Sequence, residues 1–190
     1  MKRISTLLIL LSLSLMTFAQ VKLGVQTGRY FANNYTNIQP GNNICIEVSH
    51  LLQEHLIITT QANYGNSRYF NTDTNINNVP TEEGATNADL STIHVGLMAG
   101  YYTNFSKWFS ASAQIGVSTY TQESRYPYQY EEFSYAYAQS SFTDIAFPVK
   151  ASLGFSAFKD FEIAFVVGCY IEPDYPIVGF HFGPQINLSF

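Results

Sequence analysis

Apolar and polar residues alternate strictly through most of this chain, and this alternation limits the folds that the chain can adopt. The final residues, VGFHFGPQINLSF, show it clearly, because Ile186, Leu188 and Phe190 are separated by single polar residues. A period of two places successive side chains on opposite faces of an extended strand. Eight stretches share the pattern, near residues 20–30, 43–51, 55–66, 90–103, 107–121, 142–155, 161–171 and 178–190. The sequence therefore predicts eight β-strands, each with one apolar and one polar face.

The connections between these strands alternate in length. Long polar segments follow the first, third and fifth strands, at residues 31–42, 67–89 and 122–141. Short segments follow the others, as tight turns at residues 51–55, 104–107 and 158–160 and a medium connection at residues 172–176. Transmembrane β-barrels have short turns on one side and longer loops on the other. The pattern predicts an up-and-down meander with its long loops at one end.

The composition of the polar faces separates a membrane barrel from a soluble β-sandwich or lipocalin-like barrel. Soluble sandwiches also alternate, but their polar face lies in water and should carry many lysines and glutamates. Here the polar faces are mainly Gly, Ser, Gln, Asn and Thr, and 12% of the chain is charged, against about 25% in globular domains. We predict an all-β fold, an eight-stranded antiparallel up-and-down transmembrane β-barrel. Its last strand must pair with its first, because an open edge is costly in lipid.

The N-terminal sequence MKRISTLLILLSLSLMTFAQ has the features of an export signal. Lys2 and Arg3 precede a short apolar run, and small residues lead to a cleavage site after Ala19. This arrangement predicts a cleaved secretory signal peptide over residues 1–19 and a barrel domain over residues 20–190. The alternative, a membrane anchor, is disfavoured because the apolar run is shorter than the about 20 residues that a spanning helix needs.

Cys45 and Cys169 are the two cysteines of the chain. Two cysteines of an exported protein could form a disulfide. However, they fall on strands that are not predicted neighbours, and the alternation places them on opposite faces. We therefore expect two free thiols.

The bore of an eight-stranded barrel is just wide enough to be filled by side chains. Charged residues and histidines of the polar faces are therefore expected to fill it, together with waters and glycines. This predicted interior network consists of Lys22, Glu47, His94, Asp144, Lys150, Glu162 and His181. Because carboxylates can offset both lysines, we interpret the network as structural. A proton relay, a gated narrow pore and an active site stay open as alternatives.

Two prolines, Pro148 and Pro184, fall inside predicted strands. Each removes a donor from the hydrogen-bond ladder, and a closed barrel has no spare edge for it. We expect a β-bulge at each position, and Gly183 next to Pro184 supports one there.

The segment RYPYQYEEFSYAYAQ lies in the predicted loop at residues 122–141 and is rich in aromatic residues. If the chain reverses at its two central glutamates, three aromatic pairs face each other: Tyr130 with Phe133, Tyr128 with Tyr135, and Tyr126 with Tyr137. Such pairs stabilise a hairpin by roughly 0.2–1 kcal/mol each. This register differs from that of the barrel below, so a bulge is needed between them. The ribbon is a candidate surface for an extracellular protein or glycan; alternatively it packs on itself or covers the barrel mouth.

Taken together, the signal peptide, the eight alternating strands, the small size and the ending Leu188-Ser189-Phe190 resemble small outer-membrane β-barrel proteins of the OmpA/OmpX type. The resemblance covers the whole chain after the signal peptide and is one of pattern. It implies a monomer in the outer membrane, with outer-membrane lipid against its wall. It also implies that Ile186, Leu188 and Phe190 form the signal that the barrel-assembly machinery recognises.

These features predict a structural or surface-interaction role of the adhesion type, without catalysis, cofactor or metal. A narrow pore or passage for small solutes is the first alternative. A lipid A-modifying enzyme is the second, because some eight-stranded outer-membrane barrels are deacylases or acyltransferases with a serine beside a histidine. The His-x-Ser strand pattern of the deacylases is absent, because Leu52, Ile57, Gly96 and Gly183 follow the four histidines at that spacing. Nucleic-acid binding needs a clustered basic face, whereas this chain has a formal net charge of −5.

Overall fold

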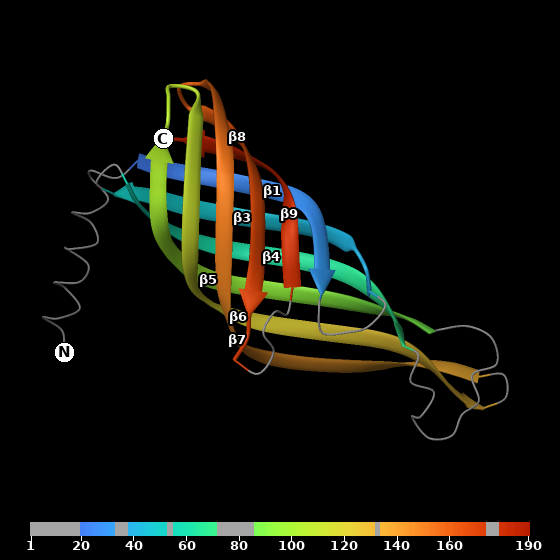
Figure 1. Ribbon diagram of the computed structural model, residues 1–190. Helices are drawn as coiled ribbons and strands as arrows, with labels where there is room; N and C mark the ends of the chain where they lie inside the picture. The colour runs from blue at the N-terminus through green and yellow to red at the C-terminus, as the bar shows by residue number, and fades with distance from the viewer. Residues whose placement is uncertain (1–19, 33–37, 53–54, 72–85, 132–133, 174–178) are drawn as a thin grey trace, which may run out of the picture.

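The computed structural model describes residues 20–32, 38–52, 55–71, 86–131, 134–173 and 179–190 (Figure 1). Within them the chain forms nine β-strands, in the order β1 (Gln20–Ala32), β2 (Ile38–Gln39), β3 (Gly41–Leu52), β4 (Leu56–Asn71), β5 (Thr86–Asn104), β6 (Phe109–Glu131), β7 (Ser134–Phe158), β8 (Phe161–Ile171) and β9 (Gly179–Ser189). Among the described residues, no helix is long and apolar enough to cross a membrane.

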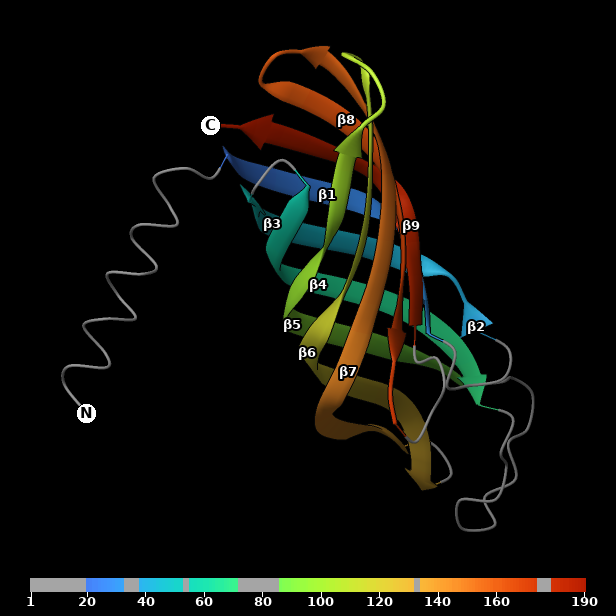
Figure 2. The same ribbon diagram turned by 60° about the vertical axis from the view of Figure 1, so that its left-hand side comes forward.

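The sheet closes on itself to form a barrel. Its strand order is β2-β4-β3-β1-β9-β8-β7-β6-β5, and an additional pairing joins β4 to β5. β2 is a two-residue strand that pairs only with Arg68 and Tyr69 of β4. The other eight strands build the wall, and all their pairings are antiparallel. Figure 2 shows the strands wound round a common axis. The predicted fold is confirmed.

The two ends of the barrel domain meet along a seam between β1 and β9. Val21 and Phe190 exchange backbone hydrogen bonds, with N···O distances of 2.9 and 3.4 Å. The backbone of Phe190 is therefore held in place, although its side chain is largely exposed on the outer wall. The seam leaves no open strand edge in the wall, where unpaired N–H and C=O groups would cost free energy in lipid.

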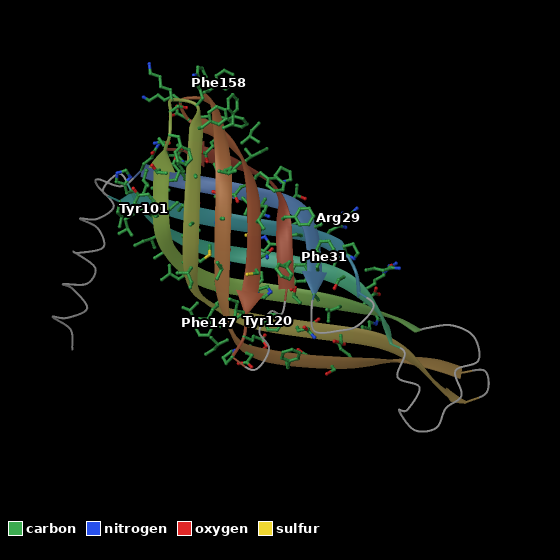
Figure 3. All side chains as sticks on the ribbon, viewed as in Figure 1. Arg29, Phe31, Tyr101, Tyr120, Phe147 and Phe158 are labelled. Carbon is green, nitrogen blue, oxygen red and sulfur yellow. The ribbon has the colours of Figure 1, made fainter. Side chains whose placement is uncertain are left out.

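The side chains of the wall are sorted as the alternation predicts. On β8, for example, buried and exposed residues alternate along nearly the whole strand. Large apolar side chains are exposed on all eight wall strands, whereas most of the buried side chains are polar. Figure 3 shows Tyr101 and Phe158 towards the end with the short turns, and Phe31 and Phe147 towards the end with the long connections. We call these two ends the turn end and the loop end.

The two cysteines are free. Cys45 is buried in the bore, whereas Cys169 belongs to the outward-facing set of β8 and is partly exposed. The expectation of two free thiols is confirmed.

Neither strand proline forms the bulge that the sequence suggested. The β6–β7 ladder skips Gly116 opposite Pro148 but resumes in the same register. The β1–β9 ladder similarly skips the residues opposite Gly183 and Pro184 without a shift. A one-residue shift would move every later side chain to the other face, so losing a few ladder bonds costs less. The bulges lie elsewhere, at Gln129/Glu131 and Ser156/Phe158.

Strands extend into two segments that were expected to be loops, at both ends of residues 67–89 and over most of residues 122–141. β4 continues to Asn71 and β5 begins at Thr86, while β6 and β7 are 23 and 25 residues long. In Figure 1 the ends of β6 and β7 project well beyond the rest of the barrel at the loop end. We call the hairpin at residues 122–142 the ribbon.

Candidate functional site

An ion pair with several hydrogen bonds fills the bore near the turn end. Lys22 of β1 lies 3.4 Å (Nζ to Oε2) from Glu162 of β8. The same carboxylate accepts hydrogen bonds of 2.7 Å from Ser110 Oγ and from Asn187 Nδ2. Lys22 Nζ also donates to the hydroxyl of Tyr102, at 3.0 Å, and lies over its ring. Both carboxylate oxygens of Glu162 are thus satisfied within the protein.

A second ion pair lies deeper in the bore and is almost completely shielded from water. Lys150 Nζ is 2.6 and 2.7 Å from the two carboxylate oxygens of Glu47, and their side chains are 3% and 1% exposed. Gln185 Nε2 donates a further hydrogen bond of 3.1 Å to Glu47. A buried charge is tolerated only when it is paired and hydrogen-bonded, and this geometry meets both conditions.

A layer of stacked rings crosses the bore on the loop side of these ion pairs. We call it the aromatic layer; it consists of Tyr30, His94, Tyr120, Tyr170 and His181. The imidazole of His94 stacks on Tyr170 with ring centroids 3.5 Å apart and on Tyr120 at 4.7 Å. Tyr30 and His181 complete the layer at 6.5 Å from His94 and 5.4 Å from Tyr170. No member is more than 2% exposed, so water does not reach these rings.

Glycines on the inner wall make room for the aromatic layer. A Cβ at Gly65 would lie 2.5 Å from the ring of Tyr30, and one at Gly179 would overlap its hydroxyl. A Cβ at Gly168 would overlap the imidazole of His181. The rings of Tyr30 and His181 therefore lie against glycines of other strands, and this close fit holds the rings in one arrangement.

The ribbon forms at the expected place but in a different register. β6 and β7 pair Tyr126 with Ala138 and Tyr128 with Ala136. The predicted aromatic pairs are therefore wrong by one residue, since Tyr135 pairs with Gln129 and Tyr137 with Pro127; Phe133 lies outside the described residues. The cause is that the register of the barrel, set at Phe109–Phe155, continues into the ribbon without the expected bulge.

Both edges of the ribbon lack a neighbouring strand among the described residues, on β6 only at residues 126–131 and on β7 over a longer stretch. β7 begins at Ser134, but β8 pairs with it only from Phe147 onwards. We call residues 134–146 of β7 the open edge. Its sequence, SYAYAQSSFTDIA, contains no lysine, arginine or proline and carries one charge, Asp144. Native sheets usually protect such edges with lysine, proline or a covering segment.

The comparisons with known proteins agree with this geometry. No protein-family model and no curated protein matches the sequence. Solved structures that match include a major outer membrane protein from Thermus thermophilus (TM-score 0.60, 9% identity), covering 90% of this chain and 99% of that chain. Neisserial surface protein A matches with a TM-score of 0.55 and 9% identity, over 90% and 97% of the two chains. The attachment invasion locus protein Ail of Yersinia pestis matches with a TM-score of 0.50 and 12% identity, over the same shares.

The chain has the fold of the small outer-membrane β-barrels. The agreement extends over nine tenths of the chain and includes the closed ring of eight strands. At 9–12% identity it describes architecture alone.

In this outer-membrane barrel fold, six of the seven residues expected in the bore are buried there: Lys22, Glu47, His94, Lys150, Glu162 and His181. The inclusion of Asp144 is wrong. It has the inward parity, but β8 pairs with β7 only from Phe147 onwards. Asp144 therefore lies on the open edge, where it is exposed, and its Oδ1 accepts a hydrogen bond from the backbone of Ile145. Among the described residues, no three His, Cys, Asp or Glu are grouped to hold a metal ion.

Four tyrosines also lie in the bore, and the predicted interior network did not include them. Tyr30, Tyr102, Tyr120 and Tyr170 all occupy positions of the polar face, whereas the predicted network contains only charged residues and histidines. Parity alone would have found them, because each lies an even number of residues from an inward-facing polar residue of its strand. A tyrosine suits this place because its ring fills volume and its hydroxyl finds partners.

Proposed function

We propose that this protein is an outer-membrane barrel with a closed bore, and that it acts in surface interaction through the open edge of its ribbon. We further propose export through the signal peptide at residues 1–19 and insertion as a monomer. Recognition by the barrel-assembly machinery would involve Ile186, Leu188 and Phe190. The outward positions of these three side chains on the closing strand support that role.

The open edge is the observation that carries the surface-interaction proposal. An unpaired strand edge presents a row of N–H and C=O groups that an extended peptide can complete as an added strand. The edge is roughly 40 Å long at the usual rise per residue. A two-stranded ribbon is only marginally stable in water by itself, so a third strand would stabilise it. Ail, which has a similar fold, is named as an attachment and invasion protein, and this is consistent with such a role.

The charge of the ribbon indicates the chemistry of the partner. Its acidic residues outnumber its basic ones, with Glu123, Glu131 and Glu132 against Arg125, and Asp144 lies just beyond it on the open edge. An extended segment with basic residues on an extracellular protein fits this surface best. A glycan is the alternative partner, since aromatic residues are abundant in the same segment.

Lysines placed on the open edge should abolish adhesion. Ser140 and Ser141 are exposed and pair with Ser124 and Glu123 of β6, so S140K/S141K should leave the ribbon folded while blocking a new strand. Cells displaying this variant are expected to adhere to immobilised laminin or collagen no better than cells without the protein.

The control for that experiment is Asp160→Lys in the exposed β7–β8 turn, which changes the net charge by the same amount at the turn end. It should adhere like the unmodified protein. Equal adhesion of S140K/S141K and the unmodified protein, or no adhesion by either, would contradict the proposed function.

The closed bore argues against the transport alternative. Two buried ion pairs and the aromatic layer occupy its cross-section, so purified protein in planar bilayers should show no discrete channel openings. The variant Tyr30→Ala/Tyr170→Ala removes two rings of the layer but leaves both ion pairs in place, so it should show no openings either. Openings of the unmodified protein would instead establish a pore. The enzyme alternative gains no support from the two bore histidines, which contact tyrosines and Gln26.

A further inference from the structure

A polar cup lies on the outer wall of the barrel, at the loop end. It has a volume of about 670 Å³ and is bordered by residues of β1 to β7. Three arginines line it, Arg29, Arg68 and Arg125, and all three are exposed on outward positions. Figure 3 shows Arg29 projecting from the wall near the loop end of β1.

The strand register arranges the cup in rows. Arg68 pairs with Asp89, which in turn pairs with Arg125, so these three form one row across β4, β5 and β6. The next row towards the turn end contains Asn66 and Ser91, which are also paired. Charged and amide groups therefore face outward on a wall that elsewhere presents apolar side chains.

The lipid-facing surface begins at the border of the cup towards the turn end, where Tyr64 lines the cup. Tyr64 pairs with Ile93, and Tyr64 also pairs with Ile44 on its other side. All three side chains are about half exposed, at 45–54%. The change from arginine to apolar residues thus takes place within four residues of one strand, from Arg68 to Tyr64, or roughly 13 Å at the usual rise.

Arg29 and Arg68 retain hydrogen-bonding capacity for an anion. Among the described residues no carboxylate lies within 4.0 Å of Arg29. Arg68 Nε is 3.0 Å from Asp89 Oδ1, but both side chains are about two-thirds exposed, and exposed pairs are weak. A guanidinium has five N–H donors, and its forked shape suits phosphate oxygens. Glu123 also borders the cup, and its carboxylate repels further negative charge. The site therefore favours a ligand with one anionic group at the arginines and neutral polar groups beside it.

We propose that this cup binds the phosphorylated headgroup of a membrane lipid, whose acyl chains lie against the apolar row of Ile44, Tyr64 and Ile93. A free phosphate would use the arginines alone, whereas a lipid also uses the apolar wall that continues directly below them. The inference relies on the membrane location within the proposed function and is independent of the role of the open edge.

Lipid retention tests this site. Protein in phosphatidylcholine nanodiscs with a minor fraction of phosphatidic acid should retain about one phosphatidic acid when examined by native mass spectrometry. Arg29→Gln should lower the affinity for phosphatidic acid about tenfold, the effect of losing one charge-assisted hydrogen bond. Asp89→Asn should raise it, because Arg68 loses its competing carboxylate.

The control is Lys107→Gln, which removes one positive charge at the turn end and should retain phosphatidic acid like the unmodified protein. S140K/S141K adds positive charge beside Glu123 and Gln139 at the border of the cup, so it should retain phosphatidic acid at least as well, and a failure of the adhesion experiment would leave this result unaffected. Equal retention by Arg29→Gln and the unmodified protein would overturn the proposal. Displacement of phosphatidic acid by millimolar inorganic phosphate would also overturn it, because the cup would then be a site for soluble anions.

Discussion

Replacing Lys150 with methionine should lower the free energy of unfolding by about 3–5 kcal/mol, the usual cost of removing one partner from a buried ion pair. The methionine would leave the carboxylate of Glu47 in the bore at 1% exposure, with Gln185 as its remaining strong donor. Denaturant titration of the barrel in lipid vesicles, followed by the gel shift between folded and boiled protein, measures the change.

Two further variants make this result specific. The double variant Lys150→Met/Glu47→Leu removes both charges, and replacing a whole buried pair by apolar side chains is often nearly neutral, so it should recover most of the lost stability. Arg68→Gln breaks an exposed pair and should cost less than about 1 kcal/mol. Equal losses in the single and the double variant would show that the charges themselves do not matter.

Substituting alanine for Gly28 should open the seam between β1 and β9. A Cβ at this position would overlap the carbonyl oxygen of Phe182 and lie 2.8 Å from the Cα of Gly183. Both obstacles are backbone atoms, so rotation of a side chain cannot relieve the overlap. We expect a loss of about 3 kcal/mol, at the upper end of the range for overpacking, or failure to form the folded band at all.

Gly24 provides the matched control, because it lies on the same strand and at the same seam. A Cβ there would approach Gln185 Nε2 at 2.5 Å and Asn187 Oδ1 at 2.7 Å, which are the ends of flexible side chains. Moving Gln185 would weaken its hydrogen bond to Glu47, but alanine gains slightly over glycine within a strand. Gly24→Ala should therefore cost about 1 kcal/mol, clearly less than Gly28→Ala. If the two variants unfold at the same denaturant concentration, close backbone approach does not determine the strength of the seam.

The alternation predicted the architecture because lipid and bore demand opposite chemistry from adjacent residues. Within the membrane-spanning wall, as along Phe161–Ile171, the strand was predicted correctly from the alternation. Outside the membrane the alternation is not required, and there the prediction failed. Beyond the membrane, β6 and β7 no longer need an apolar face, so residues 122–141 looked like a loop although aromatic residues favour strand.

Register was harder to predict than strand position, because local and long-range preferences compete. The local preference of Tyr128 for an aromatic partner suggested Tyr135. The barrel below instead holds the hairpin in the register that keeps every lipid-facing side chain outside, and Tyr128 faces Ala136. Pro148 illustrates the same principle: the loss of one donor is local, whereas a bulge would reverse the faces of the remaining strand.

The predicted contents of the bore were incomplete because the selection was based on charge, whereas the bore must also be filled by volume. Burial of Tyr170 and Tyr30 follows from the space left by glycines on other strands. Those glycines are far from the tyrosines in sequence, so the match between them becomes visible only when the ring is closed. The open edge and the arginine cup likewise depend on where each strand ends relative to its neighbour.

The seam also determines when the protein can finish folding. Val21 and Phe190 are hydrogen-bonded although nearly the whole described chain separates them, and contacts between distant residues form slowly because closing a long loop costs entropy. Until β9 pairs with β1, the two strand edges that form the seam remain unpaired and can pair with the wrong partner. A cell that makes this protein must therefore keep the exported chain apart from other such chains until its C-terminus is complete.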